Sequence, residues 1–333
     1  MNQKANRYAQ IDVLEFVFAI LIVCLHISGN DQESIVYLIG QYISRIGVPF
    51  FFTVSGFFAY QKVKSELPKV YLKRQEVKLV RIFLIWTIIY MPINFRTVFV
   101  NYDKNIVQAI FAYVRSLILE APSYMWYLVA LMIALIPFVI YGTSHLTKYT
   151  IGALIFYIIG TLLNSYRTIV GFDSLNPFYD LFVTSRNGIF FPPIFLAIGG
   201  WVNIIYRKKK DIKMWGCASL IAYILFVIEV TYVINQVPKG EDCSMYFSLP
   251  IVTMMLFTWA LLTFIIRESK ITSFCKRASL TVYCSQYGFI FVWRKLIGND
   301  NEFMLWLLVV LSGCILTCGI VKFKKCFSRF LRK

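Results

Sequence analysis

Apolar stretches of about the length of a membrane-spanning helix recur along the whole chain, with short polar connections between them. This pattern predicts about ten transmembrane helices. They fall at residues 11–29, 35–60, 82–100, 124–141, 150–165, 189–206, 214–235, 247–266, 279–297 and 304–321. The polar connections are too short to enclose a core of their own. The sequence therefore predicts an all-α, polytopic membrane helix bundle that forms a single domain over residues 1–333.

The composition supports the same class of protein. Hydrophobic residues make up 59% of the chain and charged residues only 15%, whereas charged residues are about a quarter of a soluble globular domain. The net charge of +17 comes largely from Lys and Arg in alternate connections, of which the run 207–210 is an example. Basic connections usually lie on the cytoplasmic side of a membrane protein, so both termini are predicted to be cytoplasmic. The charge thus indicates topology and a lipid bilayer partner, and not nucleic acid.

The first apolar stretch carries ionisable side chains where such groups are costly. Glu15 and His26 are eleven residues apart, so they share a helical face and lie about 16 Å apart along the axis. Ionisable side chains within a membrane usually face a bundle interior or a substrate pathway. The alternative is that His26 is a packing residue whose polar atoms are satisfied.

Glu229 is a second acid inside an apolar stretch, in the middle of residues 224–234. It has no partner within its own helix, so it is expected to pair with a cation from elsewhere in the bundle. Arg45 and Arg186 are the candidates.

The eight cysteines form no Cys-x-x-Cys pair. Most lie in apolar stretches, where cysteine acts as a small hydrophobe. Cys314 and Cys318 share a helical face, but no His or carboxylate lies within a turn of them. No metal site is expected.

Short motifs along the chain resemble, in the same order, those of the acyltransferase-3 family of bacterial integral membrane O-acyltransferases. One is Ile11-Asp12-x-Leu14, ahead of the helix that ends in His26. Another is Arg45 followed by Gly-Val-Pro, a run of Phe and Ser55-Gly-Phe. The others are the basic segment 73–81, Met125-Trp126-Tyr127-Leu128, Arg186-Asn187-Gly188 with Gly199-Gly200, and Ala278-Ser279-Leu-Thr-Val-Tyr283. The resemblance spans nearly the whole chain.

The resemblance implies a multi-pass enzyme of the bacterial cytoplasmic (inner) membrane. Members of the family move an acyl group, commonly acetyl and sometimes succinyl, from a cytoplasmic acyl-CoA such as acetyl-CoA to a hydroxyl of a cell-envelope glycan. The acyl-CoA is a co-substrate, and no tightly bound cofactor is expected. One branch of the family is the membrane part of amino-acid racemases, so membership fixes the chemistry better than the substrate.

Two positions depart from the family pattern. Glu15 stands where the first helix usually carries Arg or Lys, and a carboxylate there would repel the phosphates of a CoA donor. Gln286 stands where a His is expected after Tyr283, so a neutral hydrogen-bonding group replaces a proton carrier. Either this branch uses a rearranged site, or it has given up acyl transfer.

For acyl transfer, His26 is the candidate general base, because imidazole titrates near neutral pH; it could instead carry the acyl group covalently. Arg45 is the second catalytic candidate. Arg45 and Arg186 lie near helix ends, where a guanidinium could stabilise an oxyanion or bind an anionic acceptor. The alternative for both is that they extend to lipid headgroups.

The remaining candidates are for binding. Trp126 and Tyr127 could stack on a sugar or anchor the chain at the membrane interface. The basic connection 61–81 could receive CoA phosphates, although orientation and anionic lipid explain its charge as well. The candidate residues for substrate or acyl-donor binding are Glu15, Ser55, Trp126, Tyr127, Arg186, Asn187, Glu229 and Tyr283.

Two hypotheses of different classes follow. The first is a membrane O-acyltransferase that acylates a cell-envelope glycan. The second is a transporter or exporter of a glycan or an amino acid that keeps the fold without acyl transfer, and the residues Glu15 and Gln286 motivate it.

Overall fold

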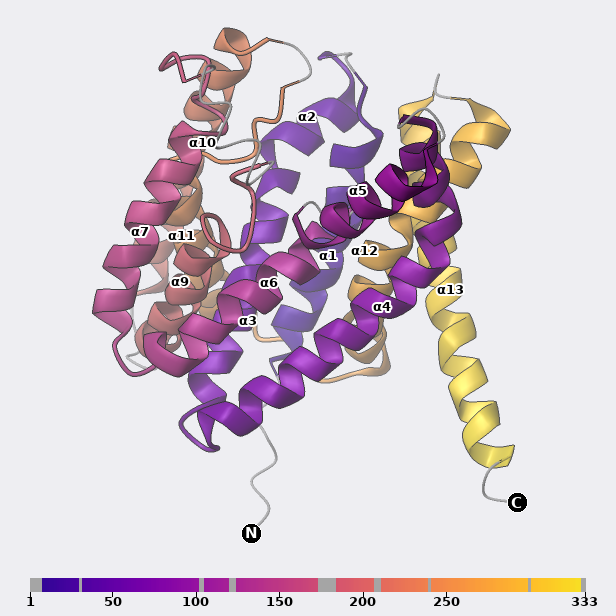
Figure 1. The fold of residues 1–333 in the computed structure, drawn as a ribbon. Coiled ribbons are helices and arrows are strands. Elements are labelled where there is room, and N and C mark those ends of the chain that lie inside the picture. The colour runs from indigo at the N-terminus through magenta and orange to yellow at the C-terminus, as the bar shows by residue number, and fades with distance from the viewer. Residues whose placement is uncertain are drawn as a thin grey trace. The chain divides into compact units, whose positions relative to one another are not determined.

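The structure of the protein is a computed structural model, which describes residues 8–29, 32–101, 105–119, 124–172, 184–206, 211–238, 241–298 and 301–330 (Figure 1). All elements of these residues are helices. The chain folds as two compact units. Unit 1 comprises Met1–Val48 and Ala260–Lys333, and unit 2 comprises Pro49–Trp259. The basic run 207–210 lies outside the described residues.

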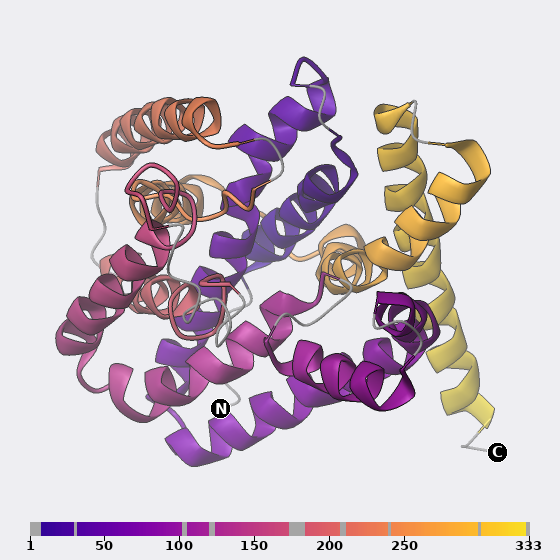
Figure 2. The same cartoon turned by 45° about the horizontal axis from the view of Figure 1, so that its top comes forward.

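Unit 1 is built around the first helix. It contains α1 (Ala9–Ile27), α2 (Ile35–Tyr42), the short 3-10 turn η1 (Ser44–Ile46), α12 (Lys270–Ile297) and α13 (Glu302–Phe330). Helix α12 packs along α1, and α13 packs on α12, as two views show (Figures 1 and 2). Helix α2 and η1 cover the C-terminal part of α1. The first helix therefore has neighbours that come from both ends of the chain.

Two hydrogen bonds and one close approach between helices hold this packing. The Trp306 indole on α13 donates to the Ile20 carbonyl of α1 at 3.1 Å, and Ser44 Oγ of η1 donates to the Leu21 carbonyl at 2.6 Å. Helix α13 approaches α12 closely at Gly313, where an added Cβ would lie 2.9 Å from the Val282 side chain. These bonds satisfy an indole N–H and a hydroxyl that lipid would leave unpaired.

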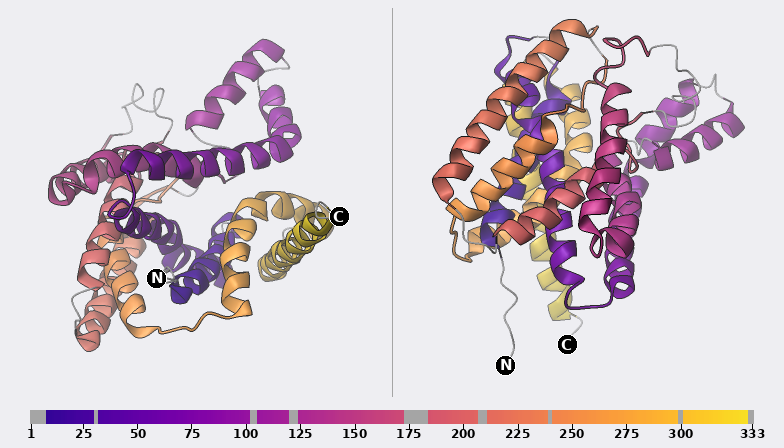
Figure 3. Two further views of the ribbon diagram at one scale, coloured as in Figure 1. Left: turned by 90° about the horizontal axis from the view of Figure 1, so that it is seen from below. Right: turned by 90° about the vertical axis from the view of Figure 1, so that its left-hand side faces the viewer.

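Unit 2 holds the rest of the helices. They are α3 (Gly47–Lys62, from Pro49 on), α4 (Pro68–Asn101), α5 (Ile106–Leu119), α6 (Trp126–Pro137), the π-helical turn η2 (Phe138–Gly142), α7 (Leu146–Leu162), α9 (Pro192–Tyr206), α10 (Ile212–Gln236) and α11 (Leu249–Thr263, up to Trp259). Helix α5 returns along α4 (Figure 3), and α9 packs on α6 and α7. The core between them is aromatic, with Phe52, Phe57, Phe191, Phe195 and Tyr157 buried.

Helices α3 and α9 cross at two glycines. A Cβ on Gly56 would lie 2.2 Å from the Leu196 carbonyl oxygen, and a Cβ on Gly199 would lie 2.2 Å from the Thr53 carbonyl oxygen. No side chain fits at either position, because the obstacle is backbone. The Ser55-Gly56-Phe57 motif and the Gly199-Gly200 motif of the sequence therefore meet at this crossing.

Within the described residues, four helical segments are long and apolar enough to cross a membrane: Ala9–Ile27, Ile35–Lys62, Ile212–Gln236 and Glu302–Lys324. Shorter apolar helices occupy Trp126–Gly142, Leu146–Leu162, Pro192–Tyr206 and Leu249–Thr263. The all-α, membrane-type fold is thus confirmed, while the number of about ten spans and the cytoplasmic termini stay predictions. Four details differ from expectation: segment 35–60 is interrupted by η1, α4 begins at Pro68 inside the basic connection 61–81, α12 begins at Lys270, and α5 lies in a connection expected to be polar.

Candidate functional site

His26 lies in the last turn of α1, in unit 1, and its side chain is half-buried. The end of this helix is held by an arginine of α12. Arg294 Nη2 donates to the carbonyl oxygens of His26 and Ile27, at 3.2 Å each. A cation at the C-terminus of a helix satisfies its last carbonyls and complements the helix dipole. Arg294 therefore fixes the backbone that carries the predicted base.

An acid of α13 binds the chain just beyond this helix end. Glu302 Oε1 accepts the Gly29 backbone N–H at 2.6 Å, and its Oε2 accepts the Ser34 hydroxyl at 2.5 Å. Ser34 is also the N-cap of α2, where its Oγ accepts the Val36 N–H. One carboxylate thus joins the end of α1 to the start of α2, which limits the motion available to His26.

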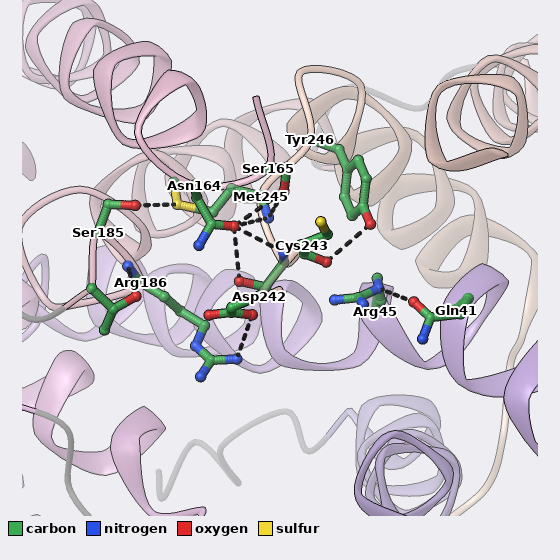
Figure 4. Close-up of polar contacts among 12 residues, drawn as sticks. Gln41, Arg45, Asn164, Ser165, Ser185, Arg186, Asp242, Cys243, Met245 and Tyr246 are labelled. Atoms are coloured by element: carbon green, nitrogen blue, oxygen red, sulfur yellow. Dashed lines mark hydrogen bonds and ion pairs between the residues drawn. The ribbon is translucent and has the colours of Figure 1, made fainter. Parts of the chain in front are cut away.

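Arg45 belongs to η1, which packs against the same helix. Its Nε donates to Gln41 Oε1 at 2.7 Å, a contact drawn in Figure 4. Ser44, its neighbour, is fully buried and bonded to α1 through the Leu21 carbonyl. The structure therefore brings both catalytic candidates, His26 and Arg45, to α1 and the turn packed upon it.

The opposite end of α1 carries the two acids. Asp12 is buried and forms an ion pair with the exposed Lys276 of α12, with Nζ and Oδ1 3.5 Å apart. Glu15 is half-buried one turn further along. The helix is continuous from Ala9 to Ile27, so the predicted separation of Glu15 and His26 along one helix holds, and the two residues do not form one contact cluster.

Helix α12 contributes the two residues of the late motif. Tyr283 is buried, and Gln286 is 0% exposed. Within the described part of the chain neither Gln286 Oε1 nor Gln286 Nε2 has a hydrogen-bond partner. A neutral amide therefore lies fully buried at the position where the family pattern has an imidazole.

In unit 2, the predicted binding residues of α3 and α6 meet. Ser55 Oγ donates to the Phe51 carbonyl at 2.9 Å and lies 3.4 Å from the Tyr127 hydroxyl. The Tyr127 ring packs on Phe52, with centroids 4.7 Å apart. Ser55, Trp126 and Tyr127 thus lie on one aromatic surface inside this unit.

Arg186 lies over this surface. Its guanidinium carbon is 4.9 Å from the centroid of the Trp126 ring, and its Nη1 donates to Asp242 Oδ1 at 3.4 Å (Figure 4). Both side chains are partly exposed, at 32% for Arg186 and 42% for Asp242. We define Trp126, Arg186 and Asp242 as the Arg186 corner. Asn187 does not face it, because its Oδ1 accepts the Ile189 N–H at 2.9 Å and forms a turn.

The backbone around the Arg186 corner is anchored separately. Asn164 Oδ1 accepts the backbone N–H groups of Ser244 and Met245, at 2.9 and 3.1 Å. Ser185 Oγ donates to the Gly160 carbonyl at 2.8 Å. The chains on both sides of the ion pair are therefore fixed to the end of α7 by other bonds.

The expected pairing of Glu229 with a cation is wrong. Its carboxylate accepts the Tyr166 hydroxyl at 2.6 Å and the backbone N–H groups of Phe247 and Ser248 at 2.7 and 2.8 Å. The Ser248 hydroxyl is a further donor. These two N–H groups precede α11 and have no helical acceptor, so the acid caps that helix. Glu229 thereby holds the start of α11, and Arg186 binds Asp242 instead. The role of Glu229 in substrate binding stays a prediction.

The predicted donor connection 61–81 contains two different acids. Exposed Arg74 binds Glu66 through both nitrogens, at 2.7 and 2.9 Å, and this hydrogen bonding lowers the pKa of Glu66. Burial raises the pKa of Glu76 to about 7, and among the described residues its Oε1 has no partner. One cation of this connection is therefore already engaged by an acid.

Sequence reasoning missed three residues at these clusters: Arg294, Glu302 and Asp242. A signal existed for Arg294, since it lies in an apolar stretch away from the predicted basic connections. The two acids lie in or beside short polar connections and carried no signal. No group of three or more His, Cys, Asp or Glu that suits a metal occurs in the part of the chain that the structure describes.

The apolar helices, with a histidine and an arginine at the end of the first helix and a second arginine on the turn packed against that helix, define an integral membrane protein with a polar site. The chain belongs to the acyltransferase-3 family: the family described as an acyltransferase domain matches residues 8–322. This membership supports a membrane acyltransferase. No solved structure matches the chain.

Curated relatives are also similar over most of the chain. It is 32% identical over 231 residues to an amino-acid racemase of Enterococcus faecalis, covering 65% of this chain and 31% of that protein. It is 28% identical over 264 residues to a serine/alanine racemase of Enterococcus gallinarum, covering 74% and 36%. The chain thus spans about a third of the length of these relatives.

Proposed function

We propose that the protein is a membrane O-acyltransferase that moves an acetyl or related acyl group from a cytoplasmic acyl-CoA to a hydroxyl of a cell-envelope glycan. The observation that carries this proposal is the end of α1. There His26 lies on a backbone bonded by Arg294, and Arg45 lies on the turn packed against the same helix. A histidine on a fixed backbone, with a guanidinium on the turn packed against the same helix, is an arrangement that suits acyl transfer.

In this reaction His26 takes the proton of the acceptor hydroxyl as its oxygen attacks the thioester carbonyl carbon. The carbonyl oxygen becomes an oxyanion, and the Arg45 guanidinium is the group proposed to stabilise it. The carbon–sulfur bond then breaks, and the imidazolium returns its proton to the thiolate of CoA. The acyl ester and free CoA are the products, so atoms and charge balance.

The test is the acyl content of envelope polysaccharide in cells that make the protein, the His26→Gln variant or no protein. We expect O-acyl groups with the wild type and a loss of about 100-fold or more with His26→Gln. His145→Gln is the matched control, because His145 is exposed and stacks on Tyr141. Unchanged acylation in the absence of the gene would exclude the proposal.

A second function is an amino-acid transporter, and two features favour it. Glu15 and Gln286 depart from the family pattern, and Gln286 is fully buried as a neutral amide. The relatives named above are amino-acid racemases. Uptake of labelled L-serine by cells that make the protein, at a rate that does not depend on acyl-CoA, would favour this function over acyl transfer.

A further inference from the structure

The Arg186 corner contains a guanidinium that is only partly used. One face is covered by the Trp126 ring, and Nη1 makes one bond to Asp242 Oδ1. Across the described residues, Arg186 Nε is shielded from solvent and has no hydrogen-bond partner. A guanidinium has five N–H donors in a fork that fits the two oxygens of a carboxylate. This one is positioned by the indole and still offers donors.

The ion pair that occupies the corner is weak by its geometry. Its separation of 3.4 Å is longer than the 2.7–2.9 Å of a good charge-assisted bond. It uses one carboxylate oxygen and not two, and both partners are partly exposed. Pairs of this kind contribute little to stability. Exchange of Asp242 for another carboxylate therefore costs little.

The pair is also not needed to hold the local backbone. The segment after Asp242 is bonded to Asn164 through the Ser244 and Met245 N–H groups. The segment at Arg186 is bonded to α7 through the Ser185 hydroxyl. A purely structural ion pair would duplicate these anchors. The partly exposed charges are therefore available for another role.

We propose that the Arg186 corner binds the carboxylate of a small ligand and that Asp242 occupies that position when no ligand is present. Both oxygens of the ligand carboxylate accept hydrogen bonds from the edge of the Arg186 guanidinium. The Asp242 side chain turns into solvent, and the Trp126 ring keeps the guanidinium plane in place. No covalent bond changes. This inference rests on the proposed function in one respect: if the ligand is the acyl acceptor, the acceptor is an acidic sugar. A free amino acid carries the same chemistry and belongs to the transporter alternative.

The experiment uses the purified full chain in detergent and measures binding of four probes: glucuronate, glucose, L-alanine and L-alaninamide. We expect one acid to bind and its neutral or amidated counterpart not to bind. Arg186→Lys keeps the charge but not the fork, and should weaken binding by about tenfold. Arg186→Gln should abolish it.

The decisive variant is Asp242→Asn. Because it removes the internal competitor, it should tighten binding of the acid by about three- to tenfold. Glu241→Gln is the matched control: it removes the same charge one residue away, where the carboxylate accepts the Thr168 hydroxyl, and should not tighten binding. Melting temperatures of all variants report whether each one folds.

The outcomes separate the two proposals. Glucuronate binding supports both the inference and an acidic glycan acceptor, whereas L-alanine binding supports the inference and counts against the proposed acyl acceptor. The inference is overturned if neither acid binds, if Arg186→Gln binds as well as wild type, or if Asp242→Asn and Glu241→Gln change affinity equally.

Discussion

Arg294 of unit 1 and Arg186 of unit 2 both lie away from the basic connections, and they are used in different ways. Arg294 donates to two backbone carbonyls at the end of α1, whereas Arg186 binds one oxygen of a partly exposed aspartate and lies on an indole. Backbone carbonyls at a helix end cannot leave without unwinding the helix. A side-chain carboxylate can rotate away.

The difference teaches how to separate structural charges from available ones in an apolar protein. Glu302 and Glu229 follow the pattern of Arg294, since Glu302 accepts one backbone N–H, Glu229 accepts two, and each also accepts a serine hydroxyl. Asp242 and Arg186 follow the other pattern. The distinction depends on whether the partner is backbone or side chain, and not on which unit holds the residue.

The largest effect is expected at Glu229. Glu229→Leu removes the acceptor of two backbone N–H groups and two hydroxyls, and should lower the free energy of unfolding by about 3 kcal/mol. Denaturant titration of the purified protein measures it. Glu229→Gln is the control, because it keeps one acceptor oxygen and should lose less. An unchanged stability of Glu229→Leu would contradict the assignment of this acid as a helix cap.

Arg294→Met should have the next effect. It keeps an apolar side chain of similar length but leaves the His26 and Ile27 carbonyls without their donor, at a cost of about 1–2 kcal/mol. Displacement of His26 should also reduce acyl transfer by about 10- to 100-fold. Arg294→Lys restores charge and one donor, so it should recover part of both. Full activity in Arg294→Met would show that Arg294 does not position the histidine.

Glu76 provides a pH-dependent test of a buried acid, whose Oε1 has no partner among the described residues. Burial raises its pKa to about 7 from the ordinary 4.5, so the folded protein binds this proton more tightly than the unfolded chain does. Stability should therefore be greatest below about pH 4.5 for this group and fall as the pH rises through 7. Melting temperatures between pH 5 and 8 should decline less in Glu76→Gln than in wild type. The control is Glu66→Gln, since the pKa of Glu66 is lowered and the group stays ionised in this range.

The smallest change in stability is expected for Asp242→Asn. An exposed pair is worth at most about 1 kcal/mol, so denaturant titration should show a shift below that value. A loss as large as that of Arg294→Met would mean that the Arg186 corner is a structural anchor after all. Arg186 and Arg294 would then both be structural residues.

The helices were predictable because hydrophobicity alone decides which segments enter lipid. The positions of most of them agree, including the helix that carries Glu15 and His26. Helix α5 was missed because its 14 residues are too few to cross a bilayer. The turn η1 was missed because a 3-10 turn leaves no pattern in an apolar run. The resemblance identified the family but not the arrangement of its motifs.

The partners of the charges were not predictable. Glu229 was expected to need a cation, but the N–H groups of residues 247 and 248 satisfy it, and an N–H group has no signature in the sequence. Arg294 and Glu302 meet α1 across more than 260 residues of chain. Such contacts depend on tertiary packing, which one sequence does not specify by spacing.

The cap at Glu229 has a consequence for the assembly of the protein in the membrane. Tyr166 precedes Glu229 by 63 residues, but Phe247 and Ser248 follow it by 18 and 19. During synthesis, α10 is therefore complete before most donors to its acid exist, and a lone carboxylate within a membrane-spanning helix costs up to about 3 kcal/mol, the value at the bilayer centre. We expect α10 and α11 to leave the translocon together as a hairpin, in which the Glu229 carboxylate is already bonded to the N–H groups of residues 247 and 248.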